Sequence, residues 1–183
     1  KLYLKIFTFS KIGNNITIES NFRISPFTKI SIGNNFYLGH NAVVESKLSN
    51  HISLGIVIGN NVWISRDIHI QNSDLILISD NVLIGEFVSI RTNKHSTNLN
   101  KPIKSQNMIV GKILIEKNVW IGRGVIIEGN SEGLTIGENS IIGANSYLKK
   151  SVPKNSIFGG NPAKFIKKKE RISSHYEECK YLN

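Results

Sequence analysis

Aliphatic residues recur at every sixth position through most of this chain, in six groups of three. All eighteen positions hold Ile, Leu or Val, in hexads that begin at Ile12, Ile18 and Ile24; Ile32, Leu38 and Val44; Ile58, Ile64 and Ile70; Ile78, Ile84 and Ile90; Ile115, Ile121 and Ile127; and Ile136, Ile142 and Leu148. The second position is often Gly, two polar residues follow, and the fifth position is usually apolar or small. This period matches neither a helix nor an ordinary alternating strand.

A six-residue period predicts a short strand that ends in a sharp corner, so three hexads form one triangular coil. The aliphatic residue points inward, while Gly or Asn at the corner tolerates left-handed backbone angles. We therefore expect an all-β fold, a parallel β-helix of about six coils over residues 12–153. An N-terminal cap over residues 1–11 would precede it, and a basic tail over residues 154–183, expected to be helical, would follow. A β-sandwich of short strands is the alternative, but its strands would alternate with period two.

The residues inserted between coils all follow the third hexad of a coil. The insertions are 2, 8, 2, 19 and 3 residues long, so every excursion is expected to leave from one corner of the prism. The longest is a 24-residue excursion, residues 91–114, which contains His95. Because side chains fill the interior of a solenoid, chemistry must lie on its faces, corners and excursions. A connection of this length usually has a function, which makes His95 the leading candidate for a catalytic residue.

Composition places the chain among soluble globular proteins, with 40% hydrophobic residues and a mean hydropathy of -0.11. No apolar run is long enough to predict a transmembrane helix. The single cysteine, Cys179, cannot form an internal disulfide, so a cytoplasmic location is expected. The net charge is +10, and residues 149–183 alone hold nine Lys or Arg against three Glu. Such a surplus either attracts an anionic partner or forms a solvated surface.

Several motifs follow one another in the second half of the chain. They read SDNVLIGEFVSI, RTNKHS, NVWIGRGVIIEG, TIGENSIIGANSYLKKSVP and IFGGNPAKFIKK. Over residues 78–167 this series resembles the hexapeptide-repeat acetyltransferases, especially the sugar and polysaccharide O-acetyltransferases. The resemblance implies a left-handed β-helix that forms homotrimers, with acetyl-CoA bound between neighbouring subunits. It also implies a saccharide acceptor, such as a capsular or lipopolysaccharide glycan.

The resemblance assigns roles to the residues at matching positions. His95 matches the general base, which takes a proton from the acceptor hydroxyl as its oxygen attacks the thioester carbonyl. Imidazole suits this role because its ordinary pKa, about 6.5, lies close to the working pH. The residues at CoA-binding positions are Trp120, Arg123, Ala144, Lys149, Lys150, Lys164 and Lys167. Asp67 and Lys94 are expected on the acceptor side, although Asn93-Lys94-His95 replaces the usual Asp-Gly-His or Thr-Gly-His.

Other functions fit parts of the same sequence. N-acetylation of an amino sugar, free or nucleotide-linked, requires nearly the same residues as O-acetylation. A zinc-dependent carbonic anhydrase on this type of solenoid needs three protein ligands, but the five histidines lack the paired spacing of such a set, so no metal is expected. A non-catalytic scaffold or anion-binding protein would use the basic tail. No aromatic stacking platform accompanies that charge, so nucleic acid is not an expected partner.

Overall fold

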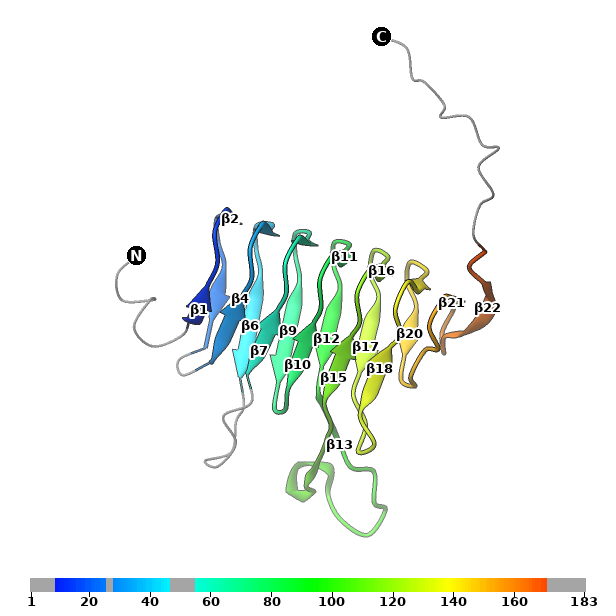
Figure 1. The fold of residues 1–183 in the computed structure, drawn as a ribbon. Helices are drawn as coiled ribbons and strands as arrows, with labels where there is room; N and C mark the ends of the chain where they lie inside the picture. The colour runs from blue at the N-terminus through cyan, green and yellow to red at the C-terminus, as the bar shows by residue number, and fades with distance from the viewer. Residues whose placement is uncertain (1–8, 26–27, 47–54, 171–183) are drawn as a thin grey trace.

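The computed structural model describes residues 9–25, 28–46 and 55–170. Within these residues, short strands turn around a three-sided prism, and each coil adds one strand to each side (Figure 1). Apart from the last strand of the described chain, neighbouring strands of the prism sides are parallel and come from consecutive coils. The described residues thus form the predicted all-β parallel β-helix, with six complete coils.

Each side of the prism is one sheet. Sheet 1 consists of β1 (Phe9–Ile12), β4 (Ile30–Ile32), β7 (Ile56–Ile58), β10 (Ile76–Ile78), β15 (Ile113–Ile115) and β18 (Leu134–Ile136). Sheet 2 consists of β2 (Ile16–Ile18), β5 (Phe36–Leu38), β8 (Val62–Ile64), β11 (Leu83–Ile84), β16 (Trp120–Ile121), β19 (Ile141–Ile142), β21 (Ser156–Gly159) and β22 (Lys164–Lys168). Sheet 3 consists of β3 (Arg23–Ile24), β6 (Val43–Ser46), β9 (His69–Asn72), β12 (Ser89–Arg91), β17 (Ile126–Glu128) and β20 (Tyr147–Leu148).

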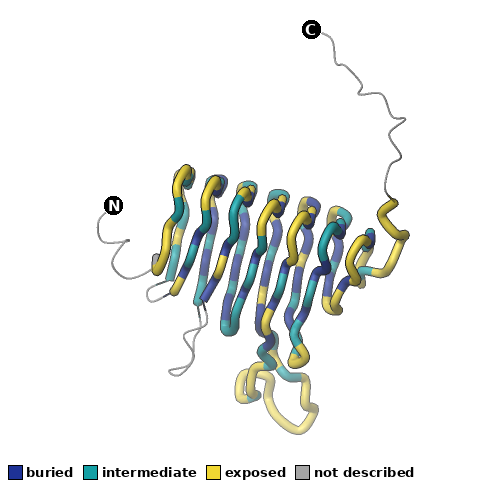
Figure 2. The backbone as a smooth tube through the Cα atoms, in the orientation of Figure 1, coloured by how far each residue is buried: buried dark blue, intermediate teal, exposed yellow. Residues whose placement is uncertain are grey.

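The hexad pattern explains which side chains fill the interior. In β8, Val62 and Ile64 are each 1% exposed, while Trp63 between them is 50% exposed. Equivalent residues pair one coil apart, as Ile84 pairs with Ile64 and with Ile121. The inward residues form continuous buried stripes along the coils (Figure 2), and truncating such a residue to Ala typically costs about 2–5 kcal/mol. A filled interior leaves the outer faces, corners and loops for a functional site.

Many corners are built from residues in the left-handed backbone conformation. Asn15, Asn35, Asn61 and Asn81 lie at equivalent corners of successive coils, with φ from 55° to 58°. Each side-chain amide donates a hydrogen bond to the next at 2.9 to 3.0 Å. Asn tolerates this conformation better than most residues, because its short polar side chain bonds locally. The amide ladder confirms the corner role predicted for Asn.

The long excursion leaves from the corner between sheets 3 and 1, as do the connections from β9 to β10 and from β17 to β18. It extends away from the prism (Figure 1). It contains an antiparallel ribbon of β13 (Asn93–His95) and β14 (Met108–Val110), with the 3₁₀ turn η1 (Ile103–Ser105) between the two strands. The predicted single corner is confirmed for these excursions, while residues 47–54 of the eight-residue insertion lie outside the described residues.

The C-terminal part is a β-hairpin, so the prediction of a helical tail is wrong for the part that the structure describes. β21 extends sheet 2, pairing Ile157 with Ile141, and β22 folds back against it in antiparallel orientation. Gly160, with a φ of 97°, and Pro162 lie between the two strands and interrupt any helix there. The open edge of β19 supplies backbone partners that only an extended chain can use.

Parts of the predicted terminal segments lie outside the described residues. These parts are residues 1–8 of the expected cap and residues 171–183 of the expected tail, including Cys179. The described end of the cap belongs to β1, which pairs with β4 of the next coil. In the part of the chain that the structure describes, no helix is long and apolar enough to cross a membrane.

Candidate functional site

Buried polar groups anchor the base of the ribbon that contains His95. Thr92 and Asn93 are 0% and 3% exposed. The Thr92 hydroxyl oxygen accepts hydrogen bonds from the backbone amides of Ser73 at 2.6 Å and Asp74 at 3.2 Å. The side-chain amide of Asn93 donates to the Ser73 hydroxyl at 2.6 Å. These bonds attach the ribbon to the turn of the preceding coil, so the first residues of the excursion are held against the prism.

His95 itself lies beyond this anchored base. It is exposed, and it pairs with Met108 across the ribbon. The next residue closes the ribbon, because the Ser96 amide donates to the carbonyl of Asn107 at 3.3 Å. Among the residues that the structure describes, none forms a hydrogen bond or ion pair with the His95 imidazole. Such an imidazole can exchange a proton with a group that a bound partner brings to it.

The tip of the excursion is ordered by the side chain of Gln106. Its oxygen accepts a hydrogen bond from the Asn98 amide at 2.7 Å, and its nitrogen donates to the carbonyls of Asn98 at 2.9 Å and Lys101 at 2.7 Å. Leu99 and Ile103 are nevertheless 100% and 54% exposed at this tip. Large apolar side chains exposed on an internally bonded loop form a surface suited to contact with another molecule.

Lys94 turns toward sheet 3. Its ammonium nitrogen lies 3.6 Å from Glu128 Oε1, and the Tyr147 hydroxyl donates to the same oxygen at 2.9 Å. Burial, the hydrogen bond to Glu128 and the negative charge of Glu128 all raise the pKa of Tyr147 above its ordinary value of 10.0. The phenol therefore remains a donor at neutral pH. Lys94, which the sequence analysis expects on the acceptor side, therefore forms an ion pair with Glu128 of the same chain.

Trp120 lies on the outer face of sheet 2, in a row of large side chains from successive strands. The row consists of Tyr37, Trp63, Leu83, Trp120 and Ile141. Trp63 and Trp120 are each 50% exposed and Leu83 is 44% exposed. The Tyr37 ring stacks on Trp63 with 3.8 Å between centroids. A continuous exposed apolar row of this kind is suited to contact with another molecule.

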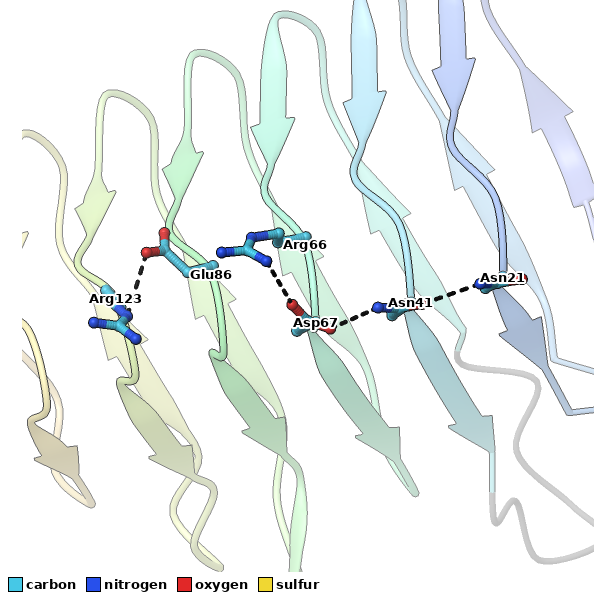
Figure 3. Close-up of polar contacts among 6 residues, drawn as sticks. All are labelled: Asn21, Asn41, Arg66, Asp67, Glu86 and Arg123. Atoms are coloured by element: carbon cyan, nitrogen blue, oxygen red, sulfur yellow. Dashed lines mark hydrogen bonds and ion pairs between the residues drawn. The ribbon is translucent and has the colours of Figure 1, made fainter.

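Asp67 and Arg123 lie at the corner between sheets 2 and 3 (Figure 3), whereas the excursion leaves from the corner between sheets 3 and 1. One oxygen of Asp67 accepts a hydrogen bond from the Asn41 amide at 2.9 Å, and the other lies 3.7 Å from Arg66 Nη1. Arg123 Nε lies 3.3 Å from Glu86 Oε1. Surface pairs of this type contribute about 0–1 kcal/mol, so either partner is available to a ligand at low cost. In a single chain, Asp67 and His95 occupy different corners of the prism.

Phe87 interrupts the polar ladder of this corner. It has a φ of 60° and is 45% exposed, and the guanidinium carbons of Arg66 and Arg123 lie 5.6 and 5.2 Å from its ring centroid. The left-handed conformation costs a residue with a β-carbon about 1–2 kcal/mol. Two exposed cation–π contacts of about 0.5–1 kcal/mol each offset much of that cost. Stacking therefore replaces hydrogen bonding at this coil.

The remaining residues at predicted CoA-binding positions are spread over the prism. Ala144 is exposed at the corner between sheets 2 and 3. Lys149 and Lys150 are exposed after β20, at the corner from which the excursion leaves, and Lys164 and Lys167 are exposed on β22 at the end of sheet 2. Of these residues, only Lys149 and Lys150 share a corner of the prism with the excursion that contains His95. Within the described ranges, no three His, Cys, Asp or Glu side chains form a metal-ligating group.

Comparison with known proteins identifies the family. A family model described as the hexapeptide repeat of succinyl-transferase matches residues 112–150. One similar structure is a hexapeptide-repeat-containing acetyltransferase from Vibrio cholerae O1 biovar eltor, solved in complex with acetyl coenzyme A. It is 31% identical to this chain with a TM-score of 0.59, and the alignment covers 73% of this chain and 71% of that chain. The chain belongs to the hexapeptide-repeat acetyltransferase family. Its prism is accordingly the left-handed parallel β-helix of these acetyltransferases, as predicted.

Two further proteins that are similar to this chain are named for different reactions. A variant of an N-acyltransferase from Bacillus cereus, in complex with dTDP and coenzyme A, is 25% identical with a TM-score of 0.74, covering 93% of this chain and 90% of that chain. The galactoside O-acetyltransferase of Escherichia coli strain K12 is 42% identical over 64 residues, 35% of this chain and 30% of that enzyme. The matched part spans 26% to 30% of the length of the first three curated relatives.

The sequence analysis did not predict a functional or structural role for Glu128, Tyr147 or Phe87. A signal for the first two exists in the repeat, because the hexad register pairs Tyr147 with Ile126, two residues before Glu128. That register places the two polar side chains on adjacent strands of sheet 3. The register does not show that Lys94 reaches Glu128, because that contact depends on how the excursion leaves the prism.

Proposed function

We propose that this chain transfers an acetyl group from acetyl-CoA to a hydroxyl of a saccharide, with His95 as the general base. The main support is that His95 is exposed on an anchored ribbon, without an intramolecular partner among the described residues, in a member of the hexapeptide-repeat acetyltransferase family. The acetyl coenzyme A in the Vibrio neighbour supports the donor. The name of the galactoside relative supports a saccharide acceptor, for which a bacterial capsular or lipopolysaccharide glycan is the class that we favour.

In the proposed reaction, His95 accepts the hydroxyl proton while the acceptor oxygen attacks the carbonyl carbon of the thioester. The tetrahedral intermediate then collapses, the carbon–sulfur bond breaks, and the imidazolium returns the proton to the departing sulfur. The products are the acetylated saccharide and CoA with a free thiol. Holding both substrates beside one imidazole makes the transfer effectively unimolecular, which accounts for much of the rate enhancement in such enzymes.

The proposed active site lies between subunits of a homotrimer. The excursion that contains His95 leaves from the corner between sheets 3 and 1, whereas Trp120 lies on sheet 2. A neighbouring copy can therefore bring the two residues together. The apolar row on sheet 2 offers a surface for that contact, and Trp120 would line the thiol arm of CoA there. Lys149, Lys150 and Lys164 would supply positive charge near the phosphates of CoA, with Lys167, Ala144 and Arg123 also at matching positions. Sedimentation of the protein as a monomer at micromolar concentration would contradict the shared site.

A second candidate function is N-acylation of an amino sugar linked to a nucleotide. It is favoured by the Bacillus cereus N-acyltransferase, which aligns over 93% of this chain and whose structure holds dTDP and coenzyme A. Amine and hydroxyl acceptors need the same donor site and a base in the same place. The acceptor therefore has to be decided by assay with both kinds of sugar.

The test measures free thiol release from acetyl-CoA with a panel of neutral, acidic, amino and nucleotide-linked sugars. We expect release that depends on a hydroxyl acceptor, and a loss of about a hundredfold or more in His95→Ala, because general-base catalysis contributes about 10²–10⁴-fold. His40→Ala is the matched control, since His40 lies on the prism and outside the excursion. Release only with amino sugars would favour N-acylation. No release and no binding of acetyl-CoA would leave the anion-binding scaffold as the better interpretation.

A further inference from the structure

The β13–β14 ribbon is the only part of the described excursion that forms regular strands, and its two strands pair only with each other. A two-stranded ribbon is marginally stable by itself in water. Its direction relative to the prism therefore depends on the contacts at its base. His95 lies at the outer end of β13, so any tilt or twist of the ribbon moves the imidazole.

The ribbon is held from two opposite sides. Successive side chains of a strand point to opposite faces, so Asn93 and His95 share one face of β13 and Lys94 lies on the other. On the first face, Asn93 is bonded to the Ser73 hydroxyl at 2.6 Å. On the second face, the Lys94 ammonium lies 3.6 Å from Glu128. Two anchors on opposite faces resist rotation about the strand axis, which one anchor alone does not.

Glu128 is itself fixed by its neighbours on sheet 3. The Tyr147 hydroxyl donates to the same carboxylate oxygen at 2.9 Å. The backbone of Tyr147 is bonded to the C-terminal hairpin, since its amide donates to the Gly160 carbonyl at 3.0 Å and its carbonyl accepts from the Ala163 amide at 2.8 Å. The Glu128 and Lys94 side chains are 24% and 34% exposed, so solvent screens their attraction less than that of a fully exposed pair.

We propose that Glu128 is a positioning residue, which orients His95 by holding Lys94 on the opposite face of the ribbon, with Tyr147 fixing the carboxylate. This role rests on the proposed function of His95. Glu128 would not touch either substrate, and Lys94 would serve the ribbon instead of the acceptor. Under this proposal, Lys94 has a structural role that acts through the adjacent His95, in place of the acceptor-side role expected from the sequence.

The experiment compares wild type with Glu128→Gln, Lys94→Met and the double variant. Two quantities are measured on each protein. The first is kcat and KM for thiol release, and the second is hydrogen exchange of the Ser96 and Gly111 amides, which donate across the ribbon to Asn107 and Thr92. We expect Glu128→Gln to lower kcat about fivefold and to speed exchange of both amides by a similar factor, which is the upper range for an ion pair near the surface. KM for acetyl-CoA should stay unchanged, and the double variant should be no worse than either single one.

Glu138→Gln is the matched control. It breaks a pair of similar geometry, 3.4 Å from Lys117 Nζ, on another corner of the prism, and it should change neither quantity. Unchanged exchange of the ribbon amides in Glu128→Gln would overturn the proposal, whether or not the enzyme turns over. A raised KM for acetyl-CoA or for the acceptor, with kcat intact, would overturn it in favour of substrate binding. Faster exchange in a protein that releases no thiol with any acceptor would support the anchor and contradict the proposed function alone.

Discussion

The corner ladder makes a specific prediction about stability at Asn61. This residue has a φ of 55°, accepts a hydrogen bond from Asn35 at 2.9 Å and donates one to Asn81 at 3.0 Å. We expect Asn61→Ala to lower the free energy of unfolding by about 2 kcal/mol. Asn61→Gly should lower it by about 1 kcal/mol, and Asn61→Asp by less than either. Asn61 lies at the corner between sheets 1 and 2, whereas the excursion leaves from the corner between sheets 3 and 1, so the proposed general base should not be disturbed.

The expected magnitudes come from two separable effects. The two side-chain hydrogen bonds are exposed, and water replaces them in part, so together they contribute about 1 kcal/mol. The left-handed conformation adds about 1 kcal/mol against Ala, whereas Gly adopts it freely. Asp keeps the acceptor and tolerates this backbone, as Asp67 does with a φ of 56° while accepting from Asn41. The difference between the Ala and Gly variants therefore isolates the backbone effect.

The assay is urea unfolding followed by circular dichroism, with thermal melting as a second measurement. For a chain of this length, a change of about 2 kcal/mol shifts the melting temperature by about 4–8 °C. The slope of free energy against urea should be the same for all four proteins, because the surface exposed on unfolding is unchanged. Equal losses for Asn61→Ala and Asn61→Gly would refute the backbone argument. An Asn61→Ala variant as stable as wild type would also refute the stabilising contribution of the hydrogen-bonded amide ladder.

Three further predictions concern the packing, the proposed donor site and the pH dependence. Gly39→Ala should destabilise by about 1–3 kcal/mol in urea unfolding, because its β-carbon would lie 2.7 Å from the Arg66 backbone nitrogen. Trp120→Ala should raise KM for acetyl-CoA by about tenfold or more. Trp63 is equally exposed in the same row, and Trp63→Ala should leave this KM unchanged. Equal effects of the two variants on KM would contradict a specific contact between Trp120 and the donor. The pKa of Tyr147 is raised in the folded protein, so the contribution of this residue to stability should be complete below about pH 10 and should disappear as the pH rises further. Tyr147→Phe should remove this pH dependence when the free energy of unfolding is measured from pH 8 to 11.

The hexad pattern was sufficient to predict the prism. Inward residues such as Ile64 and Ile84 stack because every sixth residue returns to the same place in a coil, and this repetition is local in sequence. The insertion lengths predicted the common corner of the excursions for the same reason. Asn61 and its equivalents could be placed at corners because the backbone preference of Asn is a property of the single residue. His95 could be singled out because the longest excursion is visible as a break in the period.

The tertiary structure decided what the repeat leaves open. The segment KFIKK forms β22 because the edge of β21 offers hydrogen-bond partners, and no property of the segment alone reveals that edge. Phe87 has the left-handed backbone that this corner has in every coil, and Arg66 and Arg123 from the neighbouring coils stack on its ring. The contacts that Lys94 and Tyr147 each make with Glu128 join residues from separate parts of the fold, and the Lys94 contact depends on the direction of the excursion. A sequence period determines where side chains repeat, whereas contacts between an excursion and a face depend on geometry that arises only when the whole prism has formed.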